Sequence, residues 1–247
     1  MRVAVQGDDF LSTGPSDSLR WFDGFIRKAF KVKYGVRLGP GQALEGGFLG
    51  RTLKFHPGWG YEYCPSRLHI DNAAKKAGVE GANPVAAPGV RDHGAVLSDA
   101  LDLLEPAERD RYVSATGSLI YLSVDRYDIQ YVVRLLAQKL GAPNKHDWLR
   151  LKHLCKYLLG TADWTWSFPF QERTEELHAQ SDSDWAQDKI TRRSVSSGFV
   201  ARGRHVLETW TQGQQLIALQ AGRPSSTRPA RQRRGCSTTP TCSGSWG

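Results

Sequence analysis

The first eleven residues alternate between apolar and polar positions in the manner of a β-hairpin. Val3 and Val5 are the alternating apolar positions, Gly7-Asp8-Asp9 interrupts the pattern, and Phe10-Leu11 resumes it. Glycine and aspartate favour turns, so this interruption predicts the turn of the hairpin. Asp8 and Asp9 are therefore expected at an exposed tip.

A helix, a second hairpin and a short helix are predicted next. Apolar residues recur at helical spacing over residues 17–33, which predicts a helix with one apolar face. Strands at residues 48–53 and 61–63 flank a Pro-Gly-Trp-Gly turn, a spacing typical of a hairpin. The short helix covers residues 66–77 and ends at Gly78.

The central part of the chain is predicted to be helical, after a Gly- and Pro-rich connection over residues 79–95. Three stretches fit a period of 3.6 residues, namely 106–122, 128–140 and 144–159. A helical layer with an apolar core is therefore expected. The positions predicted to face inward are Tyr112, Val113, Thr116, Leu119, Ile120, Ile129, Val132, Val133, Leu136, Trp148, Leu151, Cys155 and Leu158.

From residue 164 the apolar period changes to two, which predicts a sheet. Trp164, Trp166, Phe168 and Phe170 alternate with small or polar residues. The pattern ends at residue 220. Further strands are expected over residues 177–181, 197–201, 205–211 and 214–219.

The charge of the chain is concentrated in its tail. The sequence of 247 residues carries a net charge of +8, but residues 221–247 contain five arginines and no acidic residue, so residues 1–220 carry only +3. The tail is mostly Arg, Ser, Thr, Pro and Gly, which cannot bury enough apolar area to offset chain entropy, and we predict it to be disordered. Overall, 40% hydrophobic and 23% charged residues exclude collagen-like, fully disordered and membrane-embedded classes.

The cysteines indicate a reducing compartment. Cys64, Cys155, Cys236 and Cys242 form no CxxC pair, and no apolar segment of about 18 residues occurs. We predict reduced thiols in an intracellular protein, cytoplasmic or nuclear, that has no membrane partner. Because the chain begins directly with strand-like alternation, we also interpret it as a fragment whose partner strands lie upstream.

Adjacent aspartates at a hairpin tip are suited to divalent metal binding. A hard cation such as Mg²⁺ takes carboxylate oxygens and usually shares them with substrate phosphates. A solvated turn explains Asp8-Asp9 equally well, because aspartate favours turns. The residues alone leave both interpretations open.

Five blocks of sequence carry more information than any single motif. Together, in this order, they resemble the Pol polyprotein of copia-type retrotransposons over nearly all of residues 1–220. The blocks are Val5-Gln6-Gly7-Asp8-Asp9-Phe10-Leu11; Phe48-Leu49-Gly50-Arg51; Tyr112 with Gly117-Ser118-Leu119-Ile120-Tyr121-Leu122 and Arg126-Tyr127-Asp128-Ile129; Trp148 with Leu154 and Tyr157-Leu158-Leu159-Gly160-Thr161; and Ser181-Asp182-Ser183-Asp184-Trp185-Ala186 with Arg192-Arg193-Ser194.

The resemblance implies an α+β fold made of parts of two enzymes. Residues 1–63 resemble the end of a reverse transcriptase palm, with the Asp-Asp hairpin and a primer-grip-like hairpin. Residues 64–160 resemble the helical thumb and connection, and 161–220 a truncated ribonuclease H-like sheet, before the tail at 221–247. The implied activities are RNA-directed DNA synthesis and RNA-strand hydrolysis, with an RNA/DNA template-primer as partner and Mg²⁺ or Mn²⁺ as cofactor.

The resemblance also assigns the acidic residues. Asp8 and Asp9 are implied as catalytic metal ligands of the polymerase, Asp182 as the first carboxylate of the ribonuclease H cluster, and Asp184 as the neighbour that replaces it in a misalignment. Gln6 stands where the family usually has tyrosine.

Both implied metal sites lack further carboxylates in this chain. Two-metal catalysis needs several acidic ligands. Only seven residues precede Asp8, and Ala221-Gly222-Arg223-Pro224 stands where the family places a glutamate-bearing helix. We therefore predict that this chain alone binds the metal weakly and catalyses neither reaction, and that the missing upstream polymerase segment is a partner.

Nucleic-acid contacts are predicted at Arg51, Lys152, Lys156, Arg192 and Arg193. The two lysines lie opposite the apolar face of the helix over 144–159, where they could follow a phosphate backbone; an ordinary amphipathic surface helix explains the same pattern. Three other interpretations stay open: a non-enzymatic nucleic-acid-binding remnant, a subunit that completes its site in trans, and a decayed reading frame without function.

Overall fold

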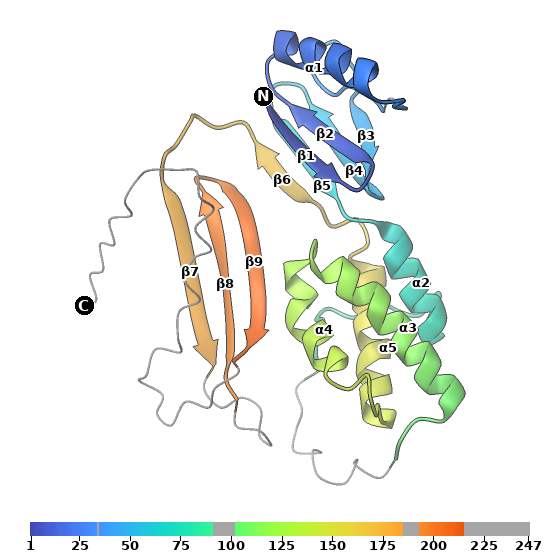
Figure 1. The fold of residues 1–247 in the computed structure, drawn as a ribbon. Helices are drawn as coiled ribbons and strands as arrows, with labels where there is room; N and C mark the ends of the chain where they lie inside the picture. The colour runs from blue at the N-terminus through green and yellow to red at the C-terminus, as the bar shows by residue number, and fades with distance from the viewer. Residues whose placement is uncertain (34, 91–101, 185–192, 215–247) are drawn as a thin grey trace, which may run out of the picture. The chain divides into compact units, whose positions relative to one another are not determined.

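The structure, a computed structural model, describes residues 1–33, 35–90, 102–184 and 193–214. It contains both helices and antiparallel sheets (Figure 1), which confirms the α+β class. The chain divides into two compact units, Met1–Ser181 with Ser197–Thr211, and Asp182–Ser196 with Gln212–Gly247.

The N-terminal hairpin forms as its alternation predicts. Strands β1 (Arg2–Gln6) and β2 (Asp9–Thr13) pair antiparallel, and Gln6 lies opposite Asp9 across a two-residue turn. Asp8 is therefore in the turn, whereas Asp9 already begins β2. Helix α1 (Ser16–Ala29) follows and ends before the predicted residue 33, because the backbone at Phe30 is extended.

A four-stranded antiparallel sheet contains the second hairpin. Its order is β3-β4-β5-β6, with β3 (Glu45–Phe48), β4 (Arg51–His56), β5 (Gly60–Cys64) and β6 (Trp166–Pro169). The single strand predicted at residues 48–53 is wrong, because a turn at Leu49-Gly50 divides it. Both turn residues have positive φ, 52° and 74°, as the tight two-residue turns of hairpins require.

Strand β6 joins this sheet from far along the chain. The strand predicted near residues 164–170 does form, and it pairs with β5 rather than with the C-terminal strands. Pro169 is tolerated there because β6 is an edge strand, where a missing N–H need not cost a ladder bond. The chain thus leaves the sheet at β5 and returns to it at β6, with the helices in between.

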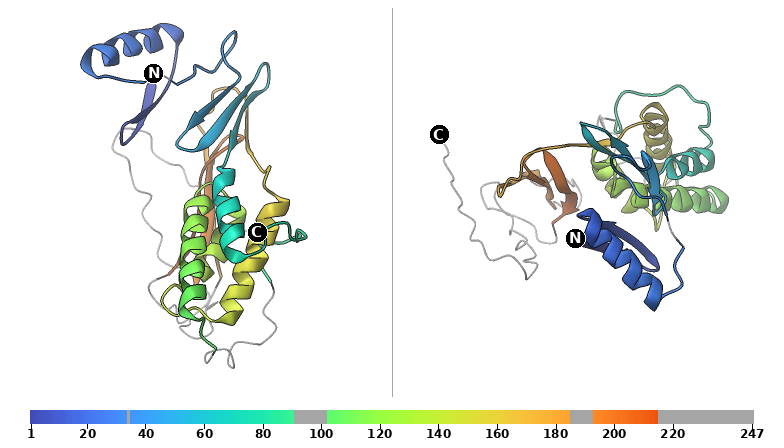
Figure 2. Two further views of the ribbon diagram at one scale, coloured as in Figure 1. Left: turned by 90° about the vertical axis from the view of Figure 1, so that its right-hand side faces the viewer. Right: turned by 90° about the horizontal axis from the view of Figure 1, so that it is seen from above.

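Those helices lie side by side in the ribbon views of Figures 1 and 2, and we call them together the helical body. The predicted stretch at 128–140 is shorter than expected as an α-helix, because its first turn is a 3-10 helix. The body consists of α2 (Arg67–Ala77), α3 (Pro106–Ser123), the 3-10 helix Tyr127–Ile129, α4 (Gln130–Ala137) and α5 (Lys145–Gly160).

Local sequence determines where these helices begin and end. Gly78 ends α2 in the left-handed conformation that glycine accepts without strain, as predicted. Pro106 occupies the first turn of α3, where its missing N–H costs nothing. Asn144 and Asp147 form a capping box at α5: the Asp147 N–H donates to Asn144 Oδ1 at 2.9 Å, and the Asn144 N–H donates to Asp147 Oδ2 at 3.1 Å.

The core of the helical body matches the predicted positions with two exceptions. Val113 and Ile120 are 39% and 40% exposed, whereas Ala115 and Leu122 are fully buried. The buried stripe of α3 thus runs to one side of the predicted one, with Ala115 and Leu122 in place of Val113 and Ile120. The other predicted inward positions of these helices are buried.

The C-terminal strands form a separate sheet in the order β7-β8-β9. Its strands are β7 (Leu177–Asp184), β8 (Val195–Arg202) and β9 (His205–Gly213). All three were predicted, with shorter bounds. The further strand predicted at residues 214–219 and the tail at 221–247 lie outside the described residues, apart from Gln214. Within the part of the chain that the structure describes, none of the helices combines the length and apolar character needed to cross a membrane.

Candidate functional site

The two predicted metal-binding regions each present a pair of aspartates. Asp8 and Asp9 are exposed at the hairpin. Asp182 and Asp184 lie two residues apart on exposed β7, so their side chains share one face of the strand. The Asp182 carboxylate accepts the backbone N–H of Ser183 at 2.8 Å. Among the described residues, no group of three or more His, Cys, Asp or Glu side chains is placed to hold a metal ion.

The predicted nucleic-acid contacts occupy different environments. Lys152 and Lys156 are half-exposed on α5, and the Lys152 Nζ lies 5.3 Å from the centre of the Trp148 ring. Arg193 is exposed, and Arg192 lies outside the described residues. Arg51 differs from the others, because its side chain is only 13% exposed and forms an ion pair.

A cluster of polar side chains lies where the four-stranded sheet meets the helical body. We call residues 125–128, between α3 and α4, the junction segment. Asp125 faces the sheet: its Oδ2 accepts from Arg51 Nε at 2.8 Å and its Oδ1 from the Tyr63 hydroxyl at 2.6 Å. Its backbone carbonyl accepts the indole N–H of Trp166 at 2.6 Å. One residue thereby contacts strands β4, β5 and β6.

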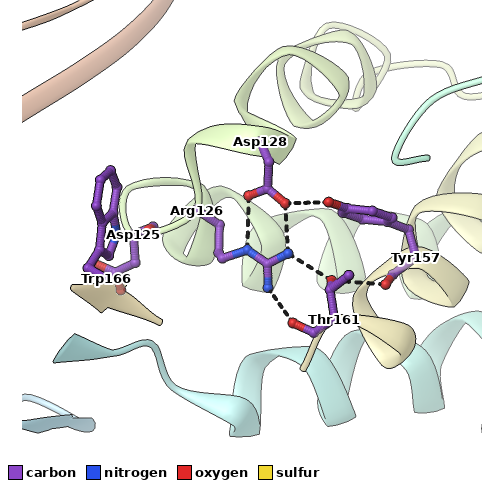
Figure 3. Close-up of polar contacts among 6 residues, drawn as sticks. All are labelled: Asp125, Arg126, Asp128, Tyr157, Thr161 and Trp166. Carbon is purple, nitrogen blue, oxygen red and sulfur yellow. Dashed lines mark hydrogen bonds and ion pairs between the residues drawn. The ribbon is translucent and has the colours of Figure 1, made fainter. Parts of the chain in front are cut away.

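Arg126 faces the opposite way, into the helical body (Figure 3). Its Nε and Nη2 donate to the two carboxylate oxygens of Asp128 at 2.9 and 2.7 Å. Its Nη1 and Nη2 donate to the backbone carbonyl and hydroxyl of Thr161, which ends α5, both at 2.8 Å. The Tyr157 hydroxyl donates to Asp128 at 2.8 Å. The junction segment therefore ties the end of α3 to the end of α5.

The ionisation of these groups follows from their contacts. Burial alone raises the pKa of Asp128, but the hydrogen bonds from Arg126 and Tyr157 outweigh it and lower that pKa below its usual value. Burial and Asp128 raise the pKa of Tyr157, and burial and Asp125 do the same for Tyr63. Asp128 is therefore ionised and both phenols are protonated at neutral pH. Ionised Asp128 can accept from Arg126 and Tyr157, and the protonated hydroxyl of Tyr63 can donate to Asp125.

This chemistry is that of a structural network. Both carboxylates of the junction segment are fully occupied by protein donors, and Arg126 is 1% exposed. Sequence resemblance gave no role to four residues that lie within the family-like blocks, namely Arg126, Asp128, Tyr157 and Thr161. The signal that indicates the role is an Arg-x-Asp pair placed between two helices with buried apolar faces, where unpaired charge would be costly.

The chain is similar in sequence to several known proteins, including Pol polyproteins from plant transposons. The chain is 35% identical to the retrovirus-related Pol polyprotein from transposon RE2 of Arabidopsis thaliana over 168 residues, which are 68% of this chain and 11% of the relative. It is 32% identical to the corresponding polyprotein from transposon RE1 of the same plant over 215 residues, 86% of this chain and 14% of the relative.

A third relative is similar in length. An uncharacterised mitochondrial protein of Arabidopsis thaliana is 26% identical over 218 residues, which cover 87% of this chain and 84% of the relative. No family model matches the chain, and no solved structure matches it. The chain spans less than a sixth of the polyproteins that it matches. By these similarities, the chain belongs to the family of retrovirus-related Pol polyproteins of copia-type transposons.

Proposed function

We propose that the chain is a piece of a reverse transcriptase and ribonuclease H, and that it performs neither reaction alone. In this proposal the part from β1 to β5 is the end of the polymerase palm, the helical body is the thumb and connection, and β7 to β9 begin a ribonuclease H domain. Asp8, Asp9 and Asp182 are the remnants of the two catalytic metal sites, and Asp184 is the alternative ligand.

The tight β1–β2 turn with Asp8 and Asp9 is the observation that carries this proposal. The two-residue turn holds Asp8, and Asp9 follows it as the first residue of β2, so both exposed carboxylates lie at one end of the hairpin and are open to a metal ion and a substrate phosphate. Two-metal phosphoryl transfer needs ions about 3.5 to 4 Å apart, held by several carboxylates. Among the described residues, no third acidic side chain lies close enough to complete a group with these two aspartates. We therefore expect only weak binding of Mg²⁺ or Mn²⁺.

A primer-extension assay tests this function. The purified full chain, an RNA template with an annealed DNA primer, deoxynucleotides and Mg²⁺ or Mn²⁺ are expected to give no incorporation above that of an Asp8→Asn, Asp9→Asn double variant. Incorporation by the unaltered chain above this control would show that the chain has a complete polymerase site.

Completion of the polymerase site in trans is the second candidate, and the surface of α1 favours it. Trp21 and Phe25 stack at 5.6 Å between ring centres, yet they are 65% and 55% exposed, and Ile26 alone is buried on this helix. The neighbouring strands expose Val5 and Phe10 as well. Large exposed apolar surfaces typically mark interaction sites.

The same assay distinguishes this candidate. We expect that adding a polypeptide that carries the missing polymerase strands and their aspartate restores incorporation to the unaltered chain. The Asp8→Asn, Asp9→Asn variant should remain inactive with the same polypeptide. Equal incorporation by both would show that the added polypeptide, rather than this chain, supplies the activity.

A further inference from the structure

Arg51 is enclosed by protein groups from three places in the sequence. Besides the ion pair with Asp125, its Nη1 donates to the Tyr121 hydroxyl of α3 at 2.8 Å and to the Leu49 carbonyl at 3.3 Å. The guanidinium also lies 4.9 Å from the centre of the Tyr121 ring. Its Nε and Nη1 donors are therefore directed at protein acceptors, in a side chain that is only 13% exposed.

Asp125 depends on this arrangement. Its side chain is 7% exposed, and its two carboxylate oxygens accept from Arg51 and Tyr63 respectively. Loss of the cationic partner of a buried carboxylate strongly destabilises the folded protein, because the desolvation of the carboxylate charge is then no longer compensated. Arg51 and Asp125 should therefore behave as one unit.

Arg51 lies next to the β3–β4 turn, so the Arg51–Asp125 pair affects that turn as well. Arg51 is the first residue of β4 and follows the Leu49-Gly50 turn directly. One guanidinium thus contacts the turn, through the Leu49 carbonyl, and the helical body, through Asp125 and Tyr121. Any change in the Arg51–Asp125 pair should alter how the turn is oriented on the body.

We propose that Arg51 is a positioning residue that holds the β3–β4 turn on the helical body through Asp125 and Tyr121, and that it does not contact nucleic-acid phosphate. This assignment replaces the prediction from sequence that Arg51 binds nucleic acid. The coupling of Arg51 to Asp125 stands without the proposed function. Its consequence for a template-primer rests on that function, in which this turn belongs to the primer-grip-like hairpin.

The coupling is measured by denaturant unfolding of the full chain and of Arg51→Gln, Asp125→Asn and the double variant. Each single change should lower the folding equilibrium constant on the order of 100-fold, and the double change by much less than the product of the two. Independent, multiplicative effects would overturn the proposal.

Arg51→Lys keeps the charge but cannot reach Asp125 and Tyr121 with a rigid fork, so it should resemble Arg51→Gln. Full recovery of stability by lysine would also overturn the proposal. If the Arg51 and Asp125 variants do not fold, Tyr121→Phe removes a single hydrogen bond and should lower the constant by about 2- to 12-fold. An unchanged folding equilibrium constant in Tyr121→Phe would count against the proposal that Arg51 holds the turn through Tyr121.

Nucleic-acid binding separates a positioning role from a phosphate contact. The probe is a labelled DNA primer annealed to an RNA template, and the readout is the slope of log affinity against log salt concentration. Arg51→Gln and Asp125→Asn should weaken binding alike and leave the slope unchanged. A slope whose magnitude is smaller by about 0.9 in Arg51→Gln alone would show a phosphate contact.

Arg20→Gln is the matched control, because Arg20 is an exposed arginine on α1 that pairs with an equally exposed aspartate. It removes the same charge without touching the junction, so its unfolding should be unchanged. If the unaltered chain does not bind the duplex at all, the consequence for a template-primer fails, whereas the unfolding measurements still decide the role of Arg51.

Discussion

A single arginine organises the inner side of the junction. Among the residues that the structure describes, Arg126 is the largest fully buried side chain, and it makes four hydrogen bonds, to Asp128 and Thr161. Its guanidinium also lies 5.0 Å from the centre of the Trp164 ring. Such a group is tolerated in a core only when every charge is paired, because desolvation of an ion costs several kcal/mol. The pair with Asp128 is therefore expected to be essential.

Asp128→Asn tests this pair and its dependence on pH. At pH 7 the change should lower the free energy of unfolding by about 3 kcal/mol, because it leaves the Arg126 charge buried without its counter-ion. The pKa of Asp128 is lowered in the folded protein, so its contribution is complete above the unfolded value of about 4 and is lost as pH falls through the lower folded value. Urea unfolding should show the variant and the unaltered chain converging in acid.

Asp71→Asn is the control for this measurement. Asp71 is half-exposed and its Oδ1 lies 3.7 Å from Arg67 Nε on the surface of α2. Exposed pairs of this kind contribute about 0 to 1 kcal/mol, so the control should lose little stability at any pH. A difference at pH 7 that persists unchanged at pH 2 would contradict the ionic origin of the Asp128 effect.

At the scale of elements, the C-terminal sheet depends on one residue without a side chain. A Cβ atom at Gly198 in β8 would lie 2.4 Å from the Trp210 ring of β9 and 2.5 Å from the Gln180 carbonyl oxygen of β7. Glycine thus allows the tryptophan to cover β8. Other covering of the sheet is uneven: Val195 and Ala201 of β8 are buried, whereas Leu207 is 59% exposed and β7 is exposed along its length.

Gly198→Ala should therefore destabilise this sheet by about 1 to 3 kcal/mol, the usual cost of inserting a methyl group into a filled space. Amide hydrogen exchange of β8 and β9 measures it. Gly117→Ala is the matched control, because a Cβ there meets no atom within 4 Å and the residue lies in α3. It should stabilise the chain by about 0.5 to 1 kcal/mol. Protection that is unchanged in Gly198→Ala would mean that Trp210 does not pack as described.

The elements also show what sequence alone can predict. Periodicity located α2, α3 and α5, because capping residues such as Gly78 and Asn144 agree with the apolar pattern. It failed at Leu49-Gly50, because leucine rarely adopts positive φ and the usual Asn-Gly signal is missing. The pairing of β6 with β5 follows from tertiary contacts that no local pattern contains.

The candidate site was predictable in part for the same reason. Asp8 and Asp9 were expected at a hairpin tip because local turn chemistry specifies it. The proposed role of Arg51 depends on Asp125 and Tyr121, which lie far from it in the chain and meet it only in the fold. Chemical type alone therefore indicated a phosphate ligand where the structure places an ion pair.

At the scale of the whole first unit, the sheet and the helical body are interleaved. The chain passes from β5 into the helices and returns to the same sheet as β6 (Figure 1), while Asp125 contacts β4, β5 and β6. Tyr127, Trp164 and Trp166 pack edge to face or tilted, with centres 5.1 to 5.7 Å apart. Opening the sheet therefore breaks contacts that the helices also need.

Sheet and body are consequently expected to unfold together. In native-state hydrogen exchange of the full chain, the slowest amides of β4 and β5 should exchange through the same opening as those of α3 and α5, with protection within about tenfold. The β1–β2 hairpin should exchange much faster, because an isolated two-stranded sheet is marginally stable and both of its faces are largely exposed.

The Asp125→Asn variant makes this expectation specific, because it removes charge from the contact that joins the three strands to the body. Protection of β4 and β5 should then fall below that of α3 and α5, so that the sheet opens before the helices. If β4 and β5 already exchange as fast as β1 and β2 in the unaltered chain, the junction segment does not couple the two parts. Cooperative unfolding would then have to be attributed to the core of the helical body alone.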